Sequence, residues 1–290
     1  MGLFYSHTRP GKGIDPNAPQ QKSVPRFFSI FFRKFWHSVR VNLLYTAALI
    51  PTYIVVFLLS GFVTSAFFLI PGVGALLQQY ETAGAWFDIL IRLLTTNLFV
   101  VLWGMGPATA GITYIMRNFA REEHAWVWSD FKDAVKNNWK QALGVFVIDC
   151  IIFTLCMVAL IVYSQMGGFA GALRYVMVMI LLVYTMMHFY IYPIMVTFEL
   201  KLKDIYRNAL LFACGKLPSN LLILALQILI HVGTVFFIIA SGGMYTVFLI
   251  ILFFLLQMMI LWSFSALLTN FHVYPKMKKY MLDAAENKTE

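Results

Sequence analysis

Six long apolar segments constrain the fold of this chain more than any other feature of its sequence. They lie at 41–70, 93–116, 142–163, 175–198 and 220–240, and from Tyr245 to about Phe271. An apolar run of roughly 18 residues or more can cross the hydrocarbon core of a membrane as a helix. Since lipid offers the backbone no hydrogen-bond partner, each run is expected to be helical. The sequence therefore predicts an all-α, polytopic membrane protein with six transmembrane helices.

The composition supports the same class and argues against several functions. Only 12% of the residues are charged, whereas a soluble domain has about 25%. The three cysteines, Cys150, Cys156 and Cys214, lie in or beside apolar segments, without the spacing of metal ligands or of a disulfide framework. We interpret them as packing residues, and we expect no metal, no cofactor and no nucleic-acid partner. No grouping of acid, base and nucleophile is recognisable, so we do not expect an enzyme.

Lysine and arginine are distributed unequally along the chain. All of them except Arg92 and Arg174 lie before the first span, in the connections after the second and fourth spans, or in the C-terminal tail. Cytoplasmic connections carry the excess of these residues in membrane proteins. We therefore predict that both termini are cytoplasmic. The expected organisation is an arm at 1–25, a membrane domain at 26–275 and a tail at 276–290.

Amphipathic segments near 26–40, 129–141 and 201–214 each precede a pair of spans. A basic, amphipathic stretch that leads into a Leu-rich span is typical of a helix lying in the membrane interface. We therefore predict three cytoplasmic elbow helices. The chain is then interpreted as three repeated units, each an elbow followed by a helical hairpin.

The first two elbows combine aromatic and basic residues. Such faces attract anionic lipid, which is therefore an expected partner at the cytoplasmic face. The predicted interfacial anchors are Trp36, Arg33 and Lys34 in the first segment, and Trp139, Lys132, Lys136 and Lys140 in the second.

The charged run between the second and third spans has a competing interpretation as a metal or catalytic cluster. Its candidates are Glu122, Glu123, His124 and Asp130. Neighbouring carboxylates point in different directions on a helix, and no second His or Cys follows at metal-binding spacing. We therefore favour a solvated interface, with docking of a cytoplasmic protein as the remaining alternative.

Polar side chains inside the spans mark a candidate intramembrane site. Asp149 lies in the third span, His188 lies at a comparable depth in the fourth, and His231 lies near the middle of the fifth. A buried carboxylate in a membrane is costly and faces a partner or a water-filled cavity. These residues therefore predict either a structural hydrogen bond between helices or a polar pathway.

The segment GMGPATAG, at 104–111, interrupts the second span. Pro107 removes a backbone donor, and Gly104, Gly106 and the small residues that follow allow close helix approach. We predict a kink or break here. It serves either tight helix packing or a discontinuous helix that lines a binding site.

Three segments carry a resemblance to a known family. GPATAGITYIMRNF followed by an acidic pair, then SDFKDAVKNNWKQAL, and ELKLKDIYRNALLFACGKLPSNLLI resemble the YesL family of bacterial membrane proteins, in its longer form. That family is built around a domain of unknown function. The resemblance implies a Gram-positive bacterium and a place near carbohydrate uptake by ABC transporters, but it supplies no catalytic residues.

Two functions of different classes follow as expectations. The first is a membrane-embedded accessory subunit of an oligosaccharide ABC importer, which contacts the permease subunits and has no chemistry of its own. The alternative is a stand-alone carrier or channel for a small solute, which uses Asp149 and the broken second span.

Overall fold

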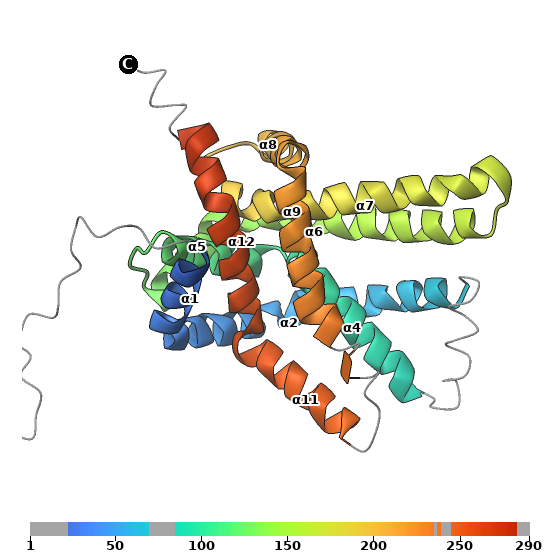
Figure 1. The fold of residues 1–290 in the computed structure, drawn as a ribbon, viewed down its shortest axis with the longest axis horizontal. Helices are drawn as coiled ribbons and strands as arrows, with labels where there is room; N and C mark the ends of the chain where they lie inside the picture. Colours follow the sequence, from blue (N-terminus) through green and yellow to red (C-terminus); the bar gives the residue numbers. More distant parts are fainter. Residues whose placement is uncertain (1–22, 70–84, 235–236, 239–244, 283–290) are drawn as a thin grey trace, which may run out of the picture.

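A computed structural model describes residues 23–69, 85–234, 237–238 and 245–282, and these ranges are helical apart from short connections (Figure 1). No strand is present in them, so the predicted all-α class is confirmed for this part of the chain. The α-helices are α1 (Ser23–Arg33), α2 (Phe35–Leu69), α4 (Ala85–Trp103), α5 (Pro107–Ala120), α6 (Val127–Ser164), α7 (Gly168–Met195), α8 (Leu202–Gly215), α9 (Leu217–Ile228), α11 (Thr246–Leu256) and α12 (Trp262–Met277). Three π-helical turns are η2 (Leu229–Gly233), η3 (Gln257–Leu261) and η4 (Lys278–Leu282).

Several of these helices are long and apolar enough to cross a membrane. Four meet this condition alone, namely Phe35–Gly61, Val127–Ser164, Gly168–Met195 and Thr246–Leu282. Two further pairs meet it together, although the first is bent by 55° between α4 and α5 and the second by 95° between α8 and α9. The protein is therefore a polytopic membrane protein, and its described residues contain four candidate spans, or up to six if each bent pair is one span.

The outer surfaces of the long helices are apolar. Leu58 on α2, Leu155 on α6 and Phe248 on α11 are each more than 60% exposed. A soluble monomer rarely leaves such large apolar surfaces open to water, whereas hydrocarbon solvates them well. These surfaces fit a protein that lies in lipid.

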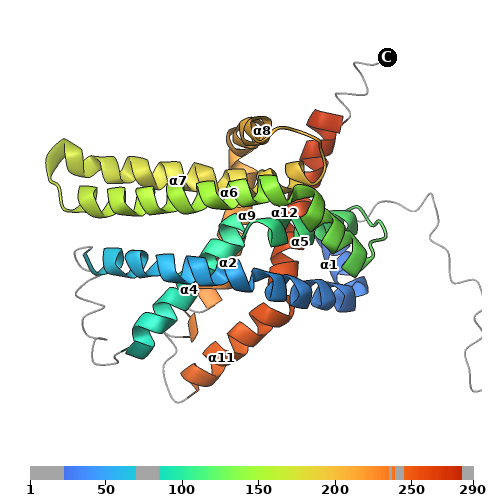
Figure 2. The same cartoon turned by 180° about the vertical axis from the view of Figure 1, so that it is seen from behind.

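Helix α5 lies in the middle of the bundle and packs against α2, α6, α7 and α12 (Figures 1 and 2). Ala110, Ile115, Met116 and Phe119 of this helix are fully buried. A side chain at Gly111 would meet the ring of Phe131 at 2.8 Å, so its absence allows α5 and α6 to approach closely. The core of the molecule therefore forms around the second half of the broken span.

The three predicted elbows do not share one geometry. The first is interrupted at Lys34, between α1 and α2, and the third is the separate helix α8. The expected separate elbow at 129–141 is wrong, because these residues are the beginning of the continuous helix α6. Phe131 and Ala134 in this stretch are buried against the protein, so packing on α5 keeps the segment in line with the span that follows. The three elbow segments therefore differ in structure, whereas a threefold repeat would require them to be alike.

The last helix is held to α2 at a π-helical turn. The side-chain amide of Asn42 donates to the carbonyls of Gln257 and Met258, at 3.0 and 2.6 Å. Its oxygen accepts the backbone N–H of Ser263 at 2.8 Å. A π turn disturbs the regular helical ladder, and Asn42 supplies partners for the backbone groups there.

Candidate functional site at the broken span

The second span breaks at Gly104–Gly106. Gly104 has a φ of 80° and Gly106 a φ of 65°, angles that glycine adopts freely and that strain other residues. Pro107 then occupies the first turn of α5, where its missing N–H costs no helical hydrogen bond. The glycines and the proline of the GMGPATAG segment therefore position the end of one helix and the start of the next.

The break changes the backbone hydrogen bonding. The N–H of Met105 donates to the Thr109 hydroxyl at 2.6 Å, and the N–H of Gly106 donates to the Tyr192 hydroxyl at 3.1 Å. Pro107 has no N–H. In a continuous helix these three residues would be the donors to the carbonyls of the residues four positions earlier. The carbonyls of 101–103 have therefore lost their helical donors.

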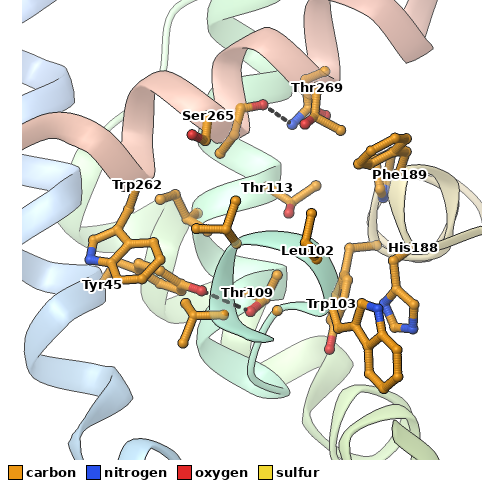
Figure 3. A pocket seen from close by; sticks show the side chains of 18 residues that line it. Tyr45, Leu102, Trp103, Thr109, Thr113, His188, Phe189, Trp262, Ser265 and Thr269 are labelled. Atoms are coloured by element: carbon orange, nitrogen blue, oxygen red, sulfur yellow. Dashed lines mark hydrogen bonds between the residues drawn. The ribbon is translucent and has the colours of Figure 1, made fainter. Parts of the chain in front are cut away.

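Residues 101–103 line a cavity of about 70 Å³ between α2, α4, α5, α7 and α12. Figure 3 shows Tyr45 hydrogen-bonded to Thr109 on one side of the cavity and Trp103 beside His188 on another. A volume of about 10–15 Å³ on this measure holds one water molecule, so the cavity accommodates a few waters or one small solute. Its polar side chains are those of Tyr45, Thr109, Thr113, His188, Tyr192, Ser265, Thr269 and Asn270.

Three buried polar atoms of lining residues have no hydrogen-bond partner in the structure, and one of them, His188 Nε2, lies against Asp149. Asn270 is 2% exposed; its amide nitrogen donates to the Ala266 carbonyl, and its Oδ1 has no partner. His188 is 5% exposed, and its Nδ1 is also without a partner. Buried polar atoms in proteins are nearly always hydrogen-bonded to protein or water. Asn270 Oδ1 and His188 Nδ1, together with the freed carbonyls, can hold water or a small polar solute.

Asp149 and His188 come together beside this cavity. Oδ1 of the fully buried Asp149 lies 2.9 Å from Nε2 of His188, a distance typical of an ion pair, although the two are not aligned as a hydrogen bond. The same Oδ1 accepts the hydroxyl of Tyr184 at 2.6 Å, whereas Oδ2 has no partner. The structure thus brings together two of the three polar residues that the sequence singled out in the spans.

His231 belongs to a different cluster. Its Nδ1 lies 3.2 Å from the Gln257 side-chain oxygen, and its Nε2 lies 2.7 Å from the Ser265 hydroxyl. These contacts tie η2 to η3 and α12. Both ring nitrogens of His231 therefore have partners, and the residue acts as a link between helices at the far side of the site.

The predicted interfacial anchors fall into two groups. Trp36 is 71% exposed and Trp139 is 47% exposed, and Lys132, Lys136 and Lys140 are also exposed. Arg33 and Lys34 instead contact the protein, because Arg33 binds Glu122 at 2.6 Å and the Lys34 ammonium lies over the ring of Phe119. The Arg33 side chain is nevertheless 45% exposed, so its ion pair with Glu122 lies at the surface.

The charged run after α5 ties the ends of helices together. Glu122 pairs with Arg33 and also with Arg26, at 2.9 Å. Hydrogen bonds from Arg33, and then from Arg26, hold the pKa of Glu122 below its ordinary value, against the opposing effect of partial burial. Asp130 accepts the backbone N–H of Trp126 near the start of α6. Among the described residues, no group of three or more His, Cys, Asp or Glu side chains could hold a metal ion.

Several residues of the site and of its surroundings were not identified from the sequence, among them Tyr184, Tyr192, Asn270 and Tyr206. Tyr184 and Tyr192 lie four positions before and after His188, a spacing that puts the three on one face of α7 and could have indicated a polar face. Asn270 is an amide within an apolar segment and could have been noted on that ground. The hydroxyl of Tyr206 lies 3.4 Å from that of Tyr184. Tyr206 belongs to α8, so no helical spacing in the sequence relates it to the residues on α7.

Comparison with known proteins places the break within a recognised family segment. Residues 85–161 match a family model described as "Protein of unknown function, DUF624". The match covers less than half of the chain and includes α4, the break, α5 and the part of α6 that carries Asp149. No curated protein and no solved structure matches the chain.

Proposed function

We propose that the protein is a carrier or channel for a small polar solute, which binds at the break between α4 and α5. The observation that carries this proposal is the pair of unpartnered buried atoms, Asn270 Oδ1 and His188 Nδ1, on two residues that line a cavity at the broken helix. Discontinuous helices in transporters use unwound carbonyls in this way to bind ions and solutes. Tight packing alone gives no reason for two unpartnered polar atoms beside a cavity.

The size of the cavity limits the solute. About 70 Å³ suits an ion with its water, or a molecule of a few heavy atoms, and is far below the roughly 300–1,000 Å³ of sites for drug-sized ligands. No Lys, Arg, Asp or Glu lines the cavity. We therefore propose a neutral polar solute or a monovalent cation.

Uptake into proteoliposomes tests the proposal. Radiolabelled glycerol, glycine and sodium are the probes, and maltotriose is the control for size. We expect uptake of at least one small probe, no uptake of maltotriose, and loss of uptake in Asn270→Leu, which removes the free oxygen but keeps the volume. The matched control is Asn208→Leu on α8, which lies outside the cavity. No uptake of any small probe by folded protein contradicts the proposal.

The membrane and the orientation are part of the same proposal. The basic end of the bundle, formed by α1, the α5–α6 connection, α8 and the end of α12, is proposed to face the cytoplasm of a Gram-positive bacterium. Arg26 and Arg33 on α1 pair with Glu122 after α5, and Lys216 after α8 contacts Tyr280 in η4. These contacts bring the basic segments together in two pairs, which supports the proposal that they share one cytoplasmic face. Trp36 and Trp139 on this end are proposed to meet anionic lipid.

A second candidate is the accessory subunit of a carbohydrate ABC importer, as the resemblance to the YesL family implies. Two tryptophans at the start of α6, Trp126 and Trp128, are each 69% exposed, and exposed aromatic side chains often form the centre of protein interfaces. An oligosaccharide does not fit the cavity, so an accessory subunit would act by contacting the permease and not by binding the oligosaccharide.

Copurification tests this second candidate. The tagged protein would retain the permease subunits in mild detergent and lose them in Trp126→Ala/Trp128→Ala. Retention of the permease by the double variant, or its absence from the wild-type complex, counts against the accessory role.

A further inference from the structure

We infer that Tyr206, Tyr184, Asp149 and His188 form a proton path between the basic end of the bundle and the cavity. The inference rests on the proposed function, since it makes occupancy of that site dependent on protons. It rests also on a chain of contacts that no packing requirement explains. The path begins on α8, crosses α7 and α6, and ends at a residue that lines the cavity.

The hydrogen bonds of this chain have one direction. The hydroxyl of Tyr184 donates its single proton to Asp149 Oδ1 at 2.6 Å, so it cannot also donate to Tyr206. The hydroxyl of Tyr206, 3.4 Å away, is then the donor to Tyr184. Both protons point toward the carboxylate, which is the arrangement that a relay to a buried base requires.

The two ends of the chain have different surroundings. Tyr206 is half-buried, and its neighbour Arg207 is exposed on the same helix, so the path opens at the basic end. Asp149 and His188 are buried at the other end, and His188 Nδ1 is unpartnered beside the cavity. A proton that reaches His188 therefore has one open direction, which is the cavity.

Each step of the path moves one proton and changes no bond between heavy atoms. A proton from solvent binds the Tyr206 oxygen as the Tyr206 proton passes to Tyr184. The Tyr184 proton passes to Asp149 Oδ1. His188 Nε2 lies 2.9 Å from the same oxygen and accepts a proton from it when the imidazole turns into line with the carboxyl group. His188 releases the proton on Nδ1 toward the cavity. The reverse sequence returns a proton to the basic end.

The surroundings of the pair favour proton exchange over a fixed charge. Asp149 Oδ2 has no partner, and a buried carboxylate with an unsatisfied oxygen is costly in its charged form. No Lys or Arg among the described residues lies within ion-pair distance of it. The titratable groups that face the pair are Cys150 on α6, Tyr184 and Tyr192 on α7, and Tyr206 on α8.

Trp103 provides a reporter inside the site. Its indole stacks on the His188 imidazole, with ring centres 5.7 Å apart and planes at 13°, and a protonated imidazole quenches indole fluorescence. The experiment is a pH titration and a stopped-flow pH jump on the whole protein in nanodiscs, without solute. The signal of Trp103 is the part of the change that disappears in Trp103→Phe.

A relay and a static hydrogen bond predict different results. We expect His188→Gln to abolish the Trp103 transition and Asp149→Asn to slow it at least about tenfold, because the group that passes the proton to His188 is lost. We expect Tyr206→Phe to keep the midpoint and to slow re-equilibration at least about tenfold, as the loss of a positioned proton donor does. Tyr175→Phe at the far end of α7, where Tyr175 is exposed, is the matched control and changes neither quantity.

Wild-type kinetics in Tyr206→Phe, or in folded Asp149→Asn, overturns the path. This titration uses no solute, so it can support the proton path even if the uptake assay contradicts the proposed carrier function. Uptake of solute without these proton effects would support the carrier function and contradict the proton path.

Discussion

The hydroxyl of Tyr192 accepts the backbone N–H of Gly106 at 3.1 Å. It thereby joins α7 to the point where the second span leaves helical geometry. Both residues belong to the lining of the site or to the break that forms it. A side chain on one helix thus replaces a partner that the backbone of another helix has lost, which is the condition for a stable break inside a membrane.

Removing that acceptor is predicted to destabilise the break. Tyr192→Phe keeps the ring but leaves the buried N–H of Gly106 unsatisfied, which costs about 1–3 kcal/mol of unfolding free energy. Thermal unfolding in detergent measures the effect. Tyr175→Phe, at an exposed position, serves as the control, and equal melting of the two variants argues against a structural role for the hydroxyl.

The two glycines of the break are predicted to be intolerant of a side chain. In Gly104→Ala the new methyl group would meet Thr109 at 2.7 Å, on a backbone with a φ of 80°. Strain of this kind costs about 1–3 kcal/mol. Gly144→Ala is the control, because its methyl group meets only Leu202, at an ordinary 3.5 Å. A melting temperature of Gly104→Ala at or above that of Gly144→Ala contradicts the geometry of the break.

Asn42 is predicted to stabilise the π turn of the last helix. Asn42→Ala leaves the Ser263 N–H without its acceptor and removes the donor to two carbonyls. We expect a loss of about 1–3 kcal/mol, measured by unfolding in detergent. Thr46→Ala, one turn further along α2, loses chiefly a bond to its own helix and is expected to cost less than about 1 kcal/mol.

The Glu122 pair is predicted to make stability depend on acid pH. Because its folded pKa lies below the ordinary value of 4.5, the pair contributes fully above that value and is lost as pH falls through the folded pKa. The contribution is expected to be below about 1 kcal/mol, since the groups are partly exposed. Melting between about pH 3 and pH 6 should show this loss. It should be absent in Glu122→Gln and present in Asp133→Asn, which alters an exposed carboxylate on α6.

The orientation is predicted to place His124 and Gln165 on opposite sides of the membrane. Both are exposed, in the connections before and after α6. With the native cysteines replaced by serine, Gln165→Cys should react with an impermeant thiol reagent in intact cells. His124→Cys should react only after the cells are opened, and the reverse pattern would invert the topology.

The sequence indicated the break because its causes are local. Two glycines before a proline decide the backbone angles of Gly104–Gly106 by themselves. The helical nature of the spans is similarly local, because lipid leaves the backbone no alternative. The course of residues 129–141 was misjudged, because packing of Phe131 on Gly111 keeps α6 continuous.

The site itself depends on contacts between distant parts of the chain. Asp149 and His188 were placed at similar depth, but only the packing of α6 on α7 brings them to 2.9 Å. Tyr206 joins them through the direction of α8, which follows from the turn after α7. The π turn held by Asn42 likewise depends on α2, more than two hundred residues away in the sequence.

Whether the cavity at the α4–α5 break binds a solute is tested most directly by measuring its access to a reagent dissolved in water. In protein without native cysteines, Thr113→Cys lines the cavity, whereas Thr96→Cys is fully buried outside it. Both are treated with a small cationic methanethiosulfonate, and modification is measured by mass spectrometry beside solute uptake. We predict rapid modification of Thr113→Cys, with loss of solute uptake, and little modification of Thr96→Cys. Equal resistance of both cysteines in the folded protein would contradict this prediction.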